Sequence, residues 1–306
     1  MKVVPCWSRT LLLPLAFFCL LAAPNRANAP QDRGGGDIAF VSMRDGIEDI
    51  YVMRPDGSAV RRVTVTQAVE GEERGSWTPA WSPDRKRLVF ASNRDEGGSA
   101  NLYAVDADGL NLVRLSAHDG FDYSPDWSPD GARIVFLSDR DGFYELYSIG
   151  ADGSDVERLT HLEKGQGGLC CPDWSPDGTS ILFMVLNPPR TAVLQVLDLV
   201  SGEVRSHGLG ALPRWSPDGT QFAFFGDGMQ VHVMNSDGSD RRQVSDVPGL
   251  ATYPSWSPDG EWIVFNHVPS MGDFDGTELF IVRASGENQR QLTFNQVMDG
   301  HPTWWE

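Results

Sequence analysis

Three charged residues hold equivalent places in consecutive copies of a short repeat and are the first candidates for chemistry. Asp126, Asp173 and Arg214 each come directly before a tryptophan that is followed by Ser-Pro-Asp. Two carboxylates at one level could hold a hard cation such as calcium through oxygen ligands. The alternative is that Arg214 pairs with Asp173 and water fills the space around them. We therefore expect a charged ring, with Asp126 and Asp173 as candidate metal ligands.

Histidines offer a second kind of chemistry. His118, His161 and His301 could together bind a transition metal, because imidazole nitrogen is a favoured ligand of such ions. They occupy different offsets within their repeats, however, and a lone histidine in a loop is usually solvated. The sequence leaves both interpretations open.

Cys170 and Cys171 are adjacent, and the other two cysteines lie in the first 19 residues. Neighbouring cysteines can join only through an eight-membered ring, and strained disulfides tend to be reducible. The pair is therefore either a vicinal disulfide or two free thiols.

Sequence motifs of several catalytic classes are absent. The chain has no Gly-x-Ser-x-Gly nucleophile elbow, no phosphate-binding glycine loop, no His-Glu-x-x-His and no Cys-x-x-Cys. This absence favours a binding protein over an enzyme.

A tryptophan repeat organises these candidates. Trp-Ser-Pro-Asp recurs five times at spacings of 46, 47, 41 and 41 residues, and a sixth tryptophan follows after 48 more. A period of about 40 to 50 residues is typical of propeller blades. We expect all six side chains to fill the core between blades: Trp81, Trp127, Trp174, Trp215, Trp256 and Trp304.

One repeat, residues 123–160, shows the strands that must position these side chains. A short strand ending at Trp127 is followed by the turn 128–131 and by three further β-rich runs, 133–138, 144–149 and 156–160. Residues 37–64 supply only the last three strands of a blade, and the C-terminal strand supplies the missing one. The prediction is an all-β, single-domain, six-bladed propeller over residues 37–306, with four-stranded antiparallel blades closed by the C-terminal strand.

The repeat resembles that of the TolB-like β-propeller family, also known as the WD40-like PD40 repeat. The resemblance rests on Pro-x-Trp-Ser-Pro-Asp-Gly, then Ser-x-Arg-Asp-Gly and a closing Arg-Leu-Thr; blades four and five depart from it at 187–190 and 226–228. It implies a periplasmic location and a propeller surface that docks other envelope proteins, as TolB docks the peptidoglycan-associated lipoprotein. TolB has an additional α/β domain before its propeller, which residues 30–36 do not supply. We therefore do not expect the rest of the Tol machinery as a partner.

The N-terminus predicts export. Lys2 and Arg9 accompany the apolar stretch 11–23, and Ala27-Asn28-Ala29 matches a signal-peptidase site, so residues 1–29 are interpreted as a signal peptide and 30–36 as a glycine-rich leader. The 13 apolar residues are too few to span a bilayer comfortably, so no stable membrane insertion of the mature chain is expected. Proline at position 30 is unfavourable after the cleaved bond, which leaves the cleavage site and an uncleaved anchor open. We expect a periplasmic or secreted monomer.

The charge of the chain excludes some partners. Asp and Glu number 42 against 25 Lys and Arg, a net charge of −17. Residues 1–29 hold three basic and no acidic residues, so their removal leaves 42 against 22, or −20. Such a chain repels phosphate backbones and attracts cations and basic protein patches, although the acidity could serve solubility alone. Nucleic acid is not expected as a partner.

Loops that converge on the central channel are the expected binding face. Trp77, Phe121 and Tyr123 do not repeat and could form an exposed aromatic anchor of the kind that dominates protein interfaces. Burial beside the repeat tryptophan is the alternative. His118 and His301 are further candidates for this face.

The sequence therefore predicts a non-enzymatic scaffold that binds an envelope protein, with no cofactor other than calcium in the channel. Two alternatives stay open. One is a lyase resembling oligogalacturonate lyase, with histidines around a metal in the channel. The other is carbohydrate binding without turnover.

Overall fold

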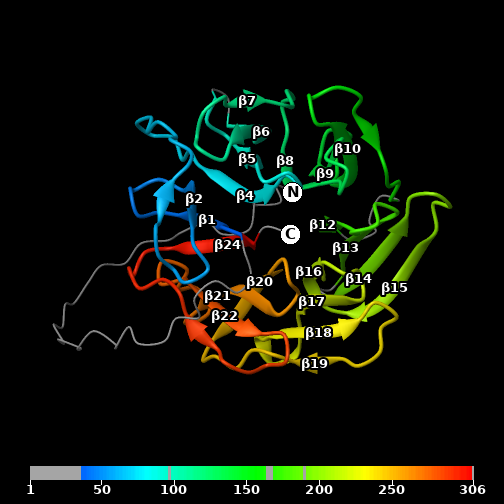
Figure 1. The fold of residues 1–306 in the computed structure, drawn as a ribbon. Coiled ribbons are helices and arrows are strands. Elements are labelled where there is room, and N and C mark those ends of the chain that lie inside the picture. Colours follow the sequence, from blue (N-terminus) through cyan, green and yellow to red (C-terminus); the bar gives the residue numbers. More distant parts are fainter. Residues whose placement is uncertain (1–35, 96–97, 163–167, 189–190, 305–306) are drawn as a thin grey trace, which may run out of the picture. The chain divides into compact units, whose positions relative to one another are not determined.

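Six four-stranded antiparallel sheets form the blades of a propeller in the computed structural model, which describes residues 36–95, 98–162, 168–188 and 191–304 (Figure 1). The predicted fold class is confirmed. The predicted signal peptide, and the leader up to residue 35, lie outside the described residues. Among the residues that are described, no helix is long and apolar enough to cross a membrane.

Each blade runs from an inner strand at the channel to a short outer strand. Blade 1 holds β24 (Asp299–Trp304), β1 (Ile38–Ser42), β2 (Asp49–Met53) and β3 (Arg61–Arg62); blade 2 holds β4 (Ser76–Trp81), β5 (Arg87–Ser92), β6 (Asn101–Asp106) and β7 (Val113–Arg114); blade 3 holds β8 (Asp122–Trp127), β9 (Arg133–Ser138), β10 (Glu145–Gly150) and β11 (Glu157–Arg158). Blade 4 holds β12 (Gly168–Trp174), β13 (Ser180–Asn187), β14 (Thr191–Asp198) and β15 (Val204–Leu209); blade 5 holds β16 (Ala211–Trp215), β17 (Gln221–Phe225), β18 (Val231–Asn235) and β19 (Arg242–Gln243); blade 6 holds β20 (Leu250–Trp256), β21 (Trp262–Val268), β22 (Glu278–Arg283) and β23 (Arg290–Gln291).

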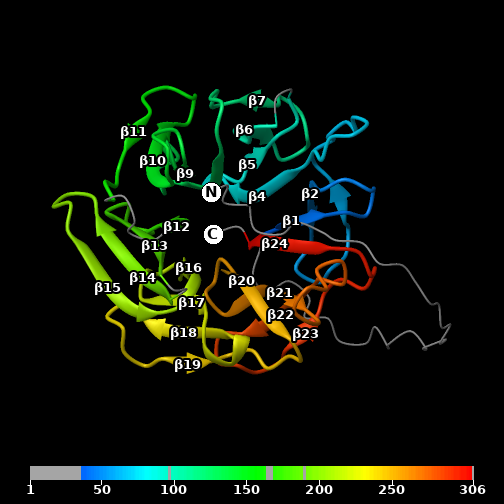
Figure 2. The same cartoon turned by 180° about the vertical axis from the view of Figure 1, so that it is seen from behind.

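Blade 1 is built from both ends of the chain, as predicted. β24 pairs antiparallel with β1, so that Trp304 lies opposite Ile38 and Asp299 opposite Ser42. Figure 2 shows the two strands side by side, as does Figure 1. The backbone N–H of Trp304 also donates to Ser255 Oγ in blade 6, at 2.9 Å. These bonds close the ring and leave no open radial edge between blades 1 and 6.

Every inner strand contains a bulge that aims one side chain at the channel. Three residues before each repeat tryptophan, a non-glycine residue with φ between 49° and 61° precedes a proline: Thr78, Ser124, Cys171, Leu212, Tyr253 and His301. Proline has no N–H to give to a ladder, so it is tolerated where the register shifts. The bulges therefore place one variable residue per blade at the same level of the channel.

The repeat tryptophans are not equally buried. Trp256 and Trp304 are 1% and 2% exposed, and Trp127 and Trp215 are also buried. Trp81 and Trp174 are only partly buried. The core role expected for all six therefore holds fully for four of them.

We expect Trp256→Ala to lower the free energy of unfolding by about 3–5 kcal/mol, because it removes a fully buried ring and leaves a cavity. Trp81→Ala should cost less, because part of that indole already faces solvent. Urea denaturation of both variants measures the difference. Equal losses would contradict the burial pattern.

Candidate functional site

The bulge residues of all six blades meet in a narrow cavity inside the channel. It is also lined by Arg214 and by three of the prolines that follow the bulges, and it leaves about 20 Å³ of space. That is room for about one water molecule. At this level the channel is too narrow for a sugar ring.

The predicted acidic pair links neighbouring blades just below this level. Asp126 accepts a hydrogen bond from the backbone N–H of Trp174 at 2.7 Å, and Asp173 accepts one from that of Trp215 at 2.6 Å. Arg214 Nε lies 3.6 Å from Asp173 Oδ1, so the pairing alternative is the one observed. Burial raises the pKa of both carboxyls, and the positive charge of Arg214 opposes the rise.

This geometry gives calcium little to bind. Two carboxylates supply fewer oxygens than the six to eight that Ca²⁺ prefers, and both already accept backbone hydrogen bonds. Within the described ranges, no three or more His, Cys, Asp or Glu residues are grouped to hold a metal ion. Calcium in the channel stays a prediction.

The histidines lie in different surroundings. His301 lines the channel cavity and packs against Tyr253, with ring centroids 4.1 Å apart and the ring planes tilted by 36°. Burial, followed by the charge of Arg214, lowers the pKa of His301 to about 4. His118 Nε2 instead lies 3.4 Å from Asp139 Oδ1 outside the cavity, and His161 is exposed. The described geometry therefore favours separate histidines over the lyase-like cluster.

The three nonrepeating aromatics are partly buried. Trp77 stacks on Tyr123, with ring centroids 5.8 Å apart and an interplanar angle of 20°, and its Nε1 donates to Glu48 Oε2 at 2.5 Å. Burial and the charge of Glu48 raise the pKa of Tyr123. The backbone N–H of Phe121 donates to Asp139 Oδ1. These contacts match the alternative of burial near the core better than that of an exposed anchor.

The charges of the Ser-x-Arg-Asp-Gly motif are used inside each blade. Arg44 Nη2 lies 2.9 Å from Asp299 Oδ2, and Arg140 Nη2 lies 3.2 Å from Asp122 Oδ1. Each pair joins the loop between the second and third strands of a blade to the inner strand of the same blade. These residues stabilise the blade and are poor candidates for ligand binding.

Exposed apolar side chains on one face were missed by sequence reasoning. We call this the loop-rich face: it carries the hairpins between second and third strands and the connections from each fourth strand to the next blade. Large apolar residues from five blades lie here: Val65 (67% exposed), Phe143 (40%), Leu186 (41%), Met229 (44%), Met271 (74%) and Phe294 (66%). Val65 and Phe294 both follow the threonine that closes a repeat, whereas the others lie in loops that differ in length and composition.

Cys170 and Cys171 form a vicinal disulfide with Cα atoms 3.7 Å apart. Cys171 is one of the channel-lining bulge residues. The bond therefore fixes the blade 4 contribution to the channel wall.

We expect the purified protein to carry this disulfide. Its intact mass should be lower than that of the reduced chain by two hydrogen atoms, and iodoacetamide should label Cys170 and Cys171 only after treatment with a reducing agent. Labelling of both thiols in the untreated protein would show that the bond is not formed.

We expect the free energy of unfolding to fall as the pH rises from about 6.5 to 8.5. A carboxyl with a raised pKa keeps its proton in the folded state at a pH where the unfolded chain has lost it, so the native state binds more protons and loses stability with rising pH. His301 opposes this fall only at the lower end of the range, because the folded state holds it neutral while the unfolded chain loses its proton around pH 6.5.

Urea denaturation of Asp173→Asn tests this origin. Asparagine keeps an oxygen that can accept the Trp215 N–H but does not titrate, so the slope should flatten. The same change at exposed Asp119 is the control and should leave the slope unchanged. An unchanged slope in Asp173→Asn would assign the pH dependence to other groups.

Comparisons with known proteins agree on the family. The model of the TolB beta propeller domain matches residues 67–167 and 161–305. The Tol-Pal system protein TolB of Desulfosudis oleivorans is 27% identical over 123 residues, which cover 40% of this chain and 26% of that protein. The chain thus matches about a quarter of the length of this curated relative.

Solved structures show the same fold. TolB from Acinetobacter baumannii superposes with a TM-score of 0.74 at 20% identity, over 88% of this chain and 66% of that one. An oligogalacturonate lyase from Vibrio parahaemolyticus reaches 0.52 at 16% identity, over 84% and 73%. Together with the bulged, tryptophan-repeated blades, the match of the family model over most of the propeller shows that this chain belongs to the TolB beta propeller domain family.

Proposed function

We propose that this protein is a non-enzymatic propeller of the cell envelope that binds a protein partner through its loop-rich face. The observation that carries the proposal is that the loops of this face leave Val65, Phe143, Leu186, Met271 and Phe294 between 40% and 74% exposed. Large, exposed apolar side chains are the anchors around which protein interfaces form. The family supports the location, because a matched relative is named as a Tol-Pal system protein.

The motif charges support the same assignment. Arg44, Arg140 and Arg158 lie on the loop-rich face, but each is paired within its blade, with Asp299, Asp122 and Glu145 respectively. A partner that approaches this face therefore meets arginines and acids that already neutralise one another, together with exposed apolar side chains. Such a surface favours an interface with an apolar centre and a polar rim.

The test compares partner binding by variants of the loop-rich face with binding by variants of the opposite face. We expect the double variant Phe143→Ser/Phe294→Ser to retain at least about tenfold less of a specific envelope protein than the wild type, because losing two anchors costs more than 1.4 kcal/mol. The measurement is quantitative mass spectrometry of proteins captured from an envelope extract after mild cross-linking.

The matched control is Leu110→Ser/Val200→Ser, which removes two apolar side chains, 63% and 87% exposed, from the opposite face. It should retain the partner as well as the wild type does. Equal retention by all three proteins would contradict the proposal, as would turnover of a polyuronate by the purified protein.

A further inference from the structure

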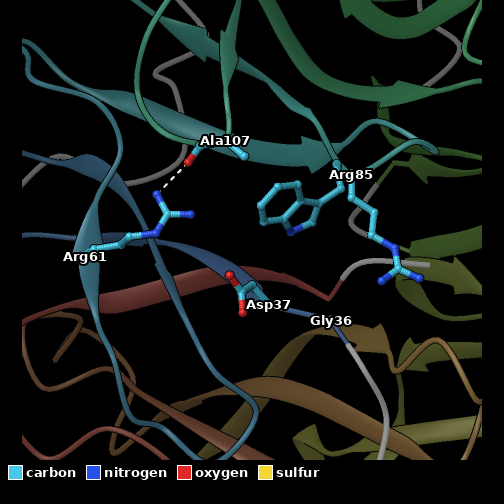
Figure 3. Close-up of a pocket in the computed structure, with 6 residues that line it drawn as sticks. Gly36, Asp37, Arg61, Arg85 and Ala107 are labelled. Carbon is cyan, nitrogen blue, oxygen red and sulfur yellow. Dashed lines mark hydrogen bonds between the residues drawn. The ribbon is translucent and has the colours of Figure 1, made fainter.

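A second pocket lies where the ring closes, on the face opposite the loop-rich face. Its volume is about 310 Å³, and it is lined by Gly36, Asp37, Arg61, Trp81, Arg85 and Ala107 (Figure 3). These residues come from blade 1 and from blade 2, and we call the site the closure pocket. Its size is at the lower end of the range for small-molecule sites.

The pocket exists because blade 1 lacks a turn. In blades 3 to 6 the glycine of the Ser-Pro-Asp-Gly turn lies against the proline of the preceding blade's turn: Gly131 against Pro83, Gly178 against Pro129, Gly219 against Pro176 and Gly260 against Pro217. Blade 1 has no such turn, because its first strand ends at Trp304 and its second begins at Ile38. Within the described residues, the turn of blade 2 therefore has no matching turn of blade 1 beside it, and Trp81 lines the pocket.

Arg85 departs from the repeat at this same place. It has φ of 62°, where the other four turns have glycine with φ between 67° and 76°. A side chain in this left-handed conformation is strained, and glycine would avoid the strain. A strained residue that lines a pocket is a reason to look for a function there.

The polar groups of the pocket suit a carboxylate. Arg61 Nη1 donates to the carbonyl oxygen of Ala107 at 2.5 Å, which orients the guanidinium and uses one of its five N–H donors. The planar guanidinium matches a carboxylate in geometry and charge. Figure 3 shows Arg61 on one side of the pocket, with its guanidinium directed to Ala107, and the carboxylate of Asp37 pointing into the pocket. Arg85 lies on the other side, and its guanidinium points away from Arg61.

We propose that the closure pocket binds a small molecule in which a carboxylate is attached to a six-membered ring. Arg61 anchors the carboxylate, the indole of Trp81 contacts the face of the ring, and Asp37 accepts hydrogen bonds from ring substituents. Arg85 adds positive charge on the far side. Aromatic acids and sugar acids share this chemistry, and the loop-rich face stays open while the pocket is occupied.

The binding test adds four probes, one at a time, to the full-length mature protein. Isothermal titration calorimetry measures the binding of each probe, and NMR records changes in the indole N–H signals. Benzoate and glucuronate carry the ring and the carboxylate, whereas benzamide and glucose lack the charge. We expect at least one acid to bind about tenfold more tightly than its neutral analogue. Binding of benzoate alone identifies an aromatic acid as the ligand class, and binding of glucuronate alone identifies a sugar acid. Failure of both acids, or equal binding of the neutral probes, overturns the proposal.

Variants locate the site. Arg61→Gln should weaken binding of the acid at least about tenfold, because the charged hydrogen-bond partner is lost. Arg85→Gly restores the repeat residue, so it should fold at least as stably as the wild type and bind a few-fold more weakly. Arg205→Gln, which removes an exposed arginine from blade 4, is the control and should bind as the wild type does. If Arg61→Gln also binds as the wild type does, the acid is held elsewhere and the proposal fails.

Discussion

Pairing of the first and last strands is the interaction on which the rest of the structure depends. The ladder between β1 and β24 joins residues more than 250 positions apart and supplies the inner strand that blade 1 lacks. Without it the core between blades 1 and 6, which includes Ile38, Trp262 and Trp304, would open to solvent. The same pairing removes one turn from the ring, so the closure pocket is a direct consequence of how the ring is sealed.

The residues that repeat in every blade and the residues available for binding are different sets. The repeated motif residues bond to other residues of the same blade: Ser82 Oγ donates to Asp84, the Tyr51 hydroxyl donates to Asp45, and Arg44 pairs with Asp299. Side chains that vary between blades are left to line the channel and cover the loop-rich face. This division explains why the repeat is informative about the fold and nearly silent about the ligand.

The channel shows what an equal position in the repeat can and cannot predict. Asp126, Asp173 and Arg214 each precede a repeat tryptophan and do lie close together, because every inner strand has the same bulge and the same direction. The offset did not reveal that each carboxylate is already occupied by the backbone N–H of the next blade. That bond depends on the distance between blades, which no spacing within one repeat contains.

The sequence by itself determined the number of blades, the four strands of each, the family and the closure by the C-terminal strand, since all of these follow from a period and from turn chemistry that act locally. Only the tertiary structure decided that Trp81 is partly uncovered, that the Arg-Asp pairs lie within blades, and that Arg61 and Arg85 line one pocket. The sequence shows Arg85 where the other turns have glycine, but it does not show that this residue lines a pocket. Burial depends on which neighbour covers a side chain, and at the closure the described part of blade 1 places no turn against Trp81.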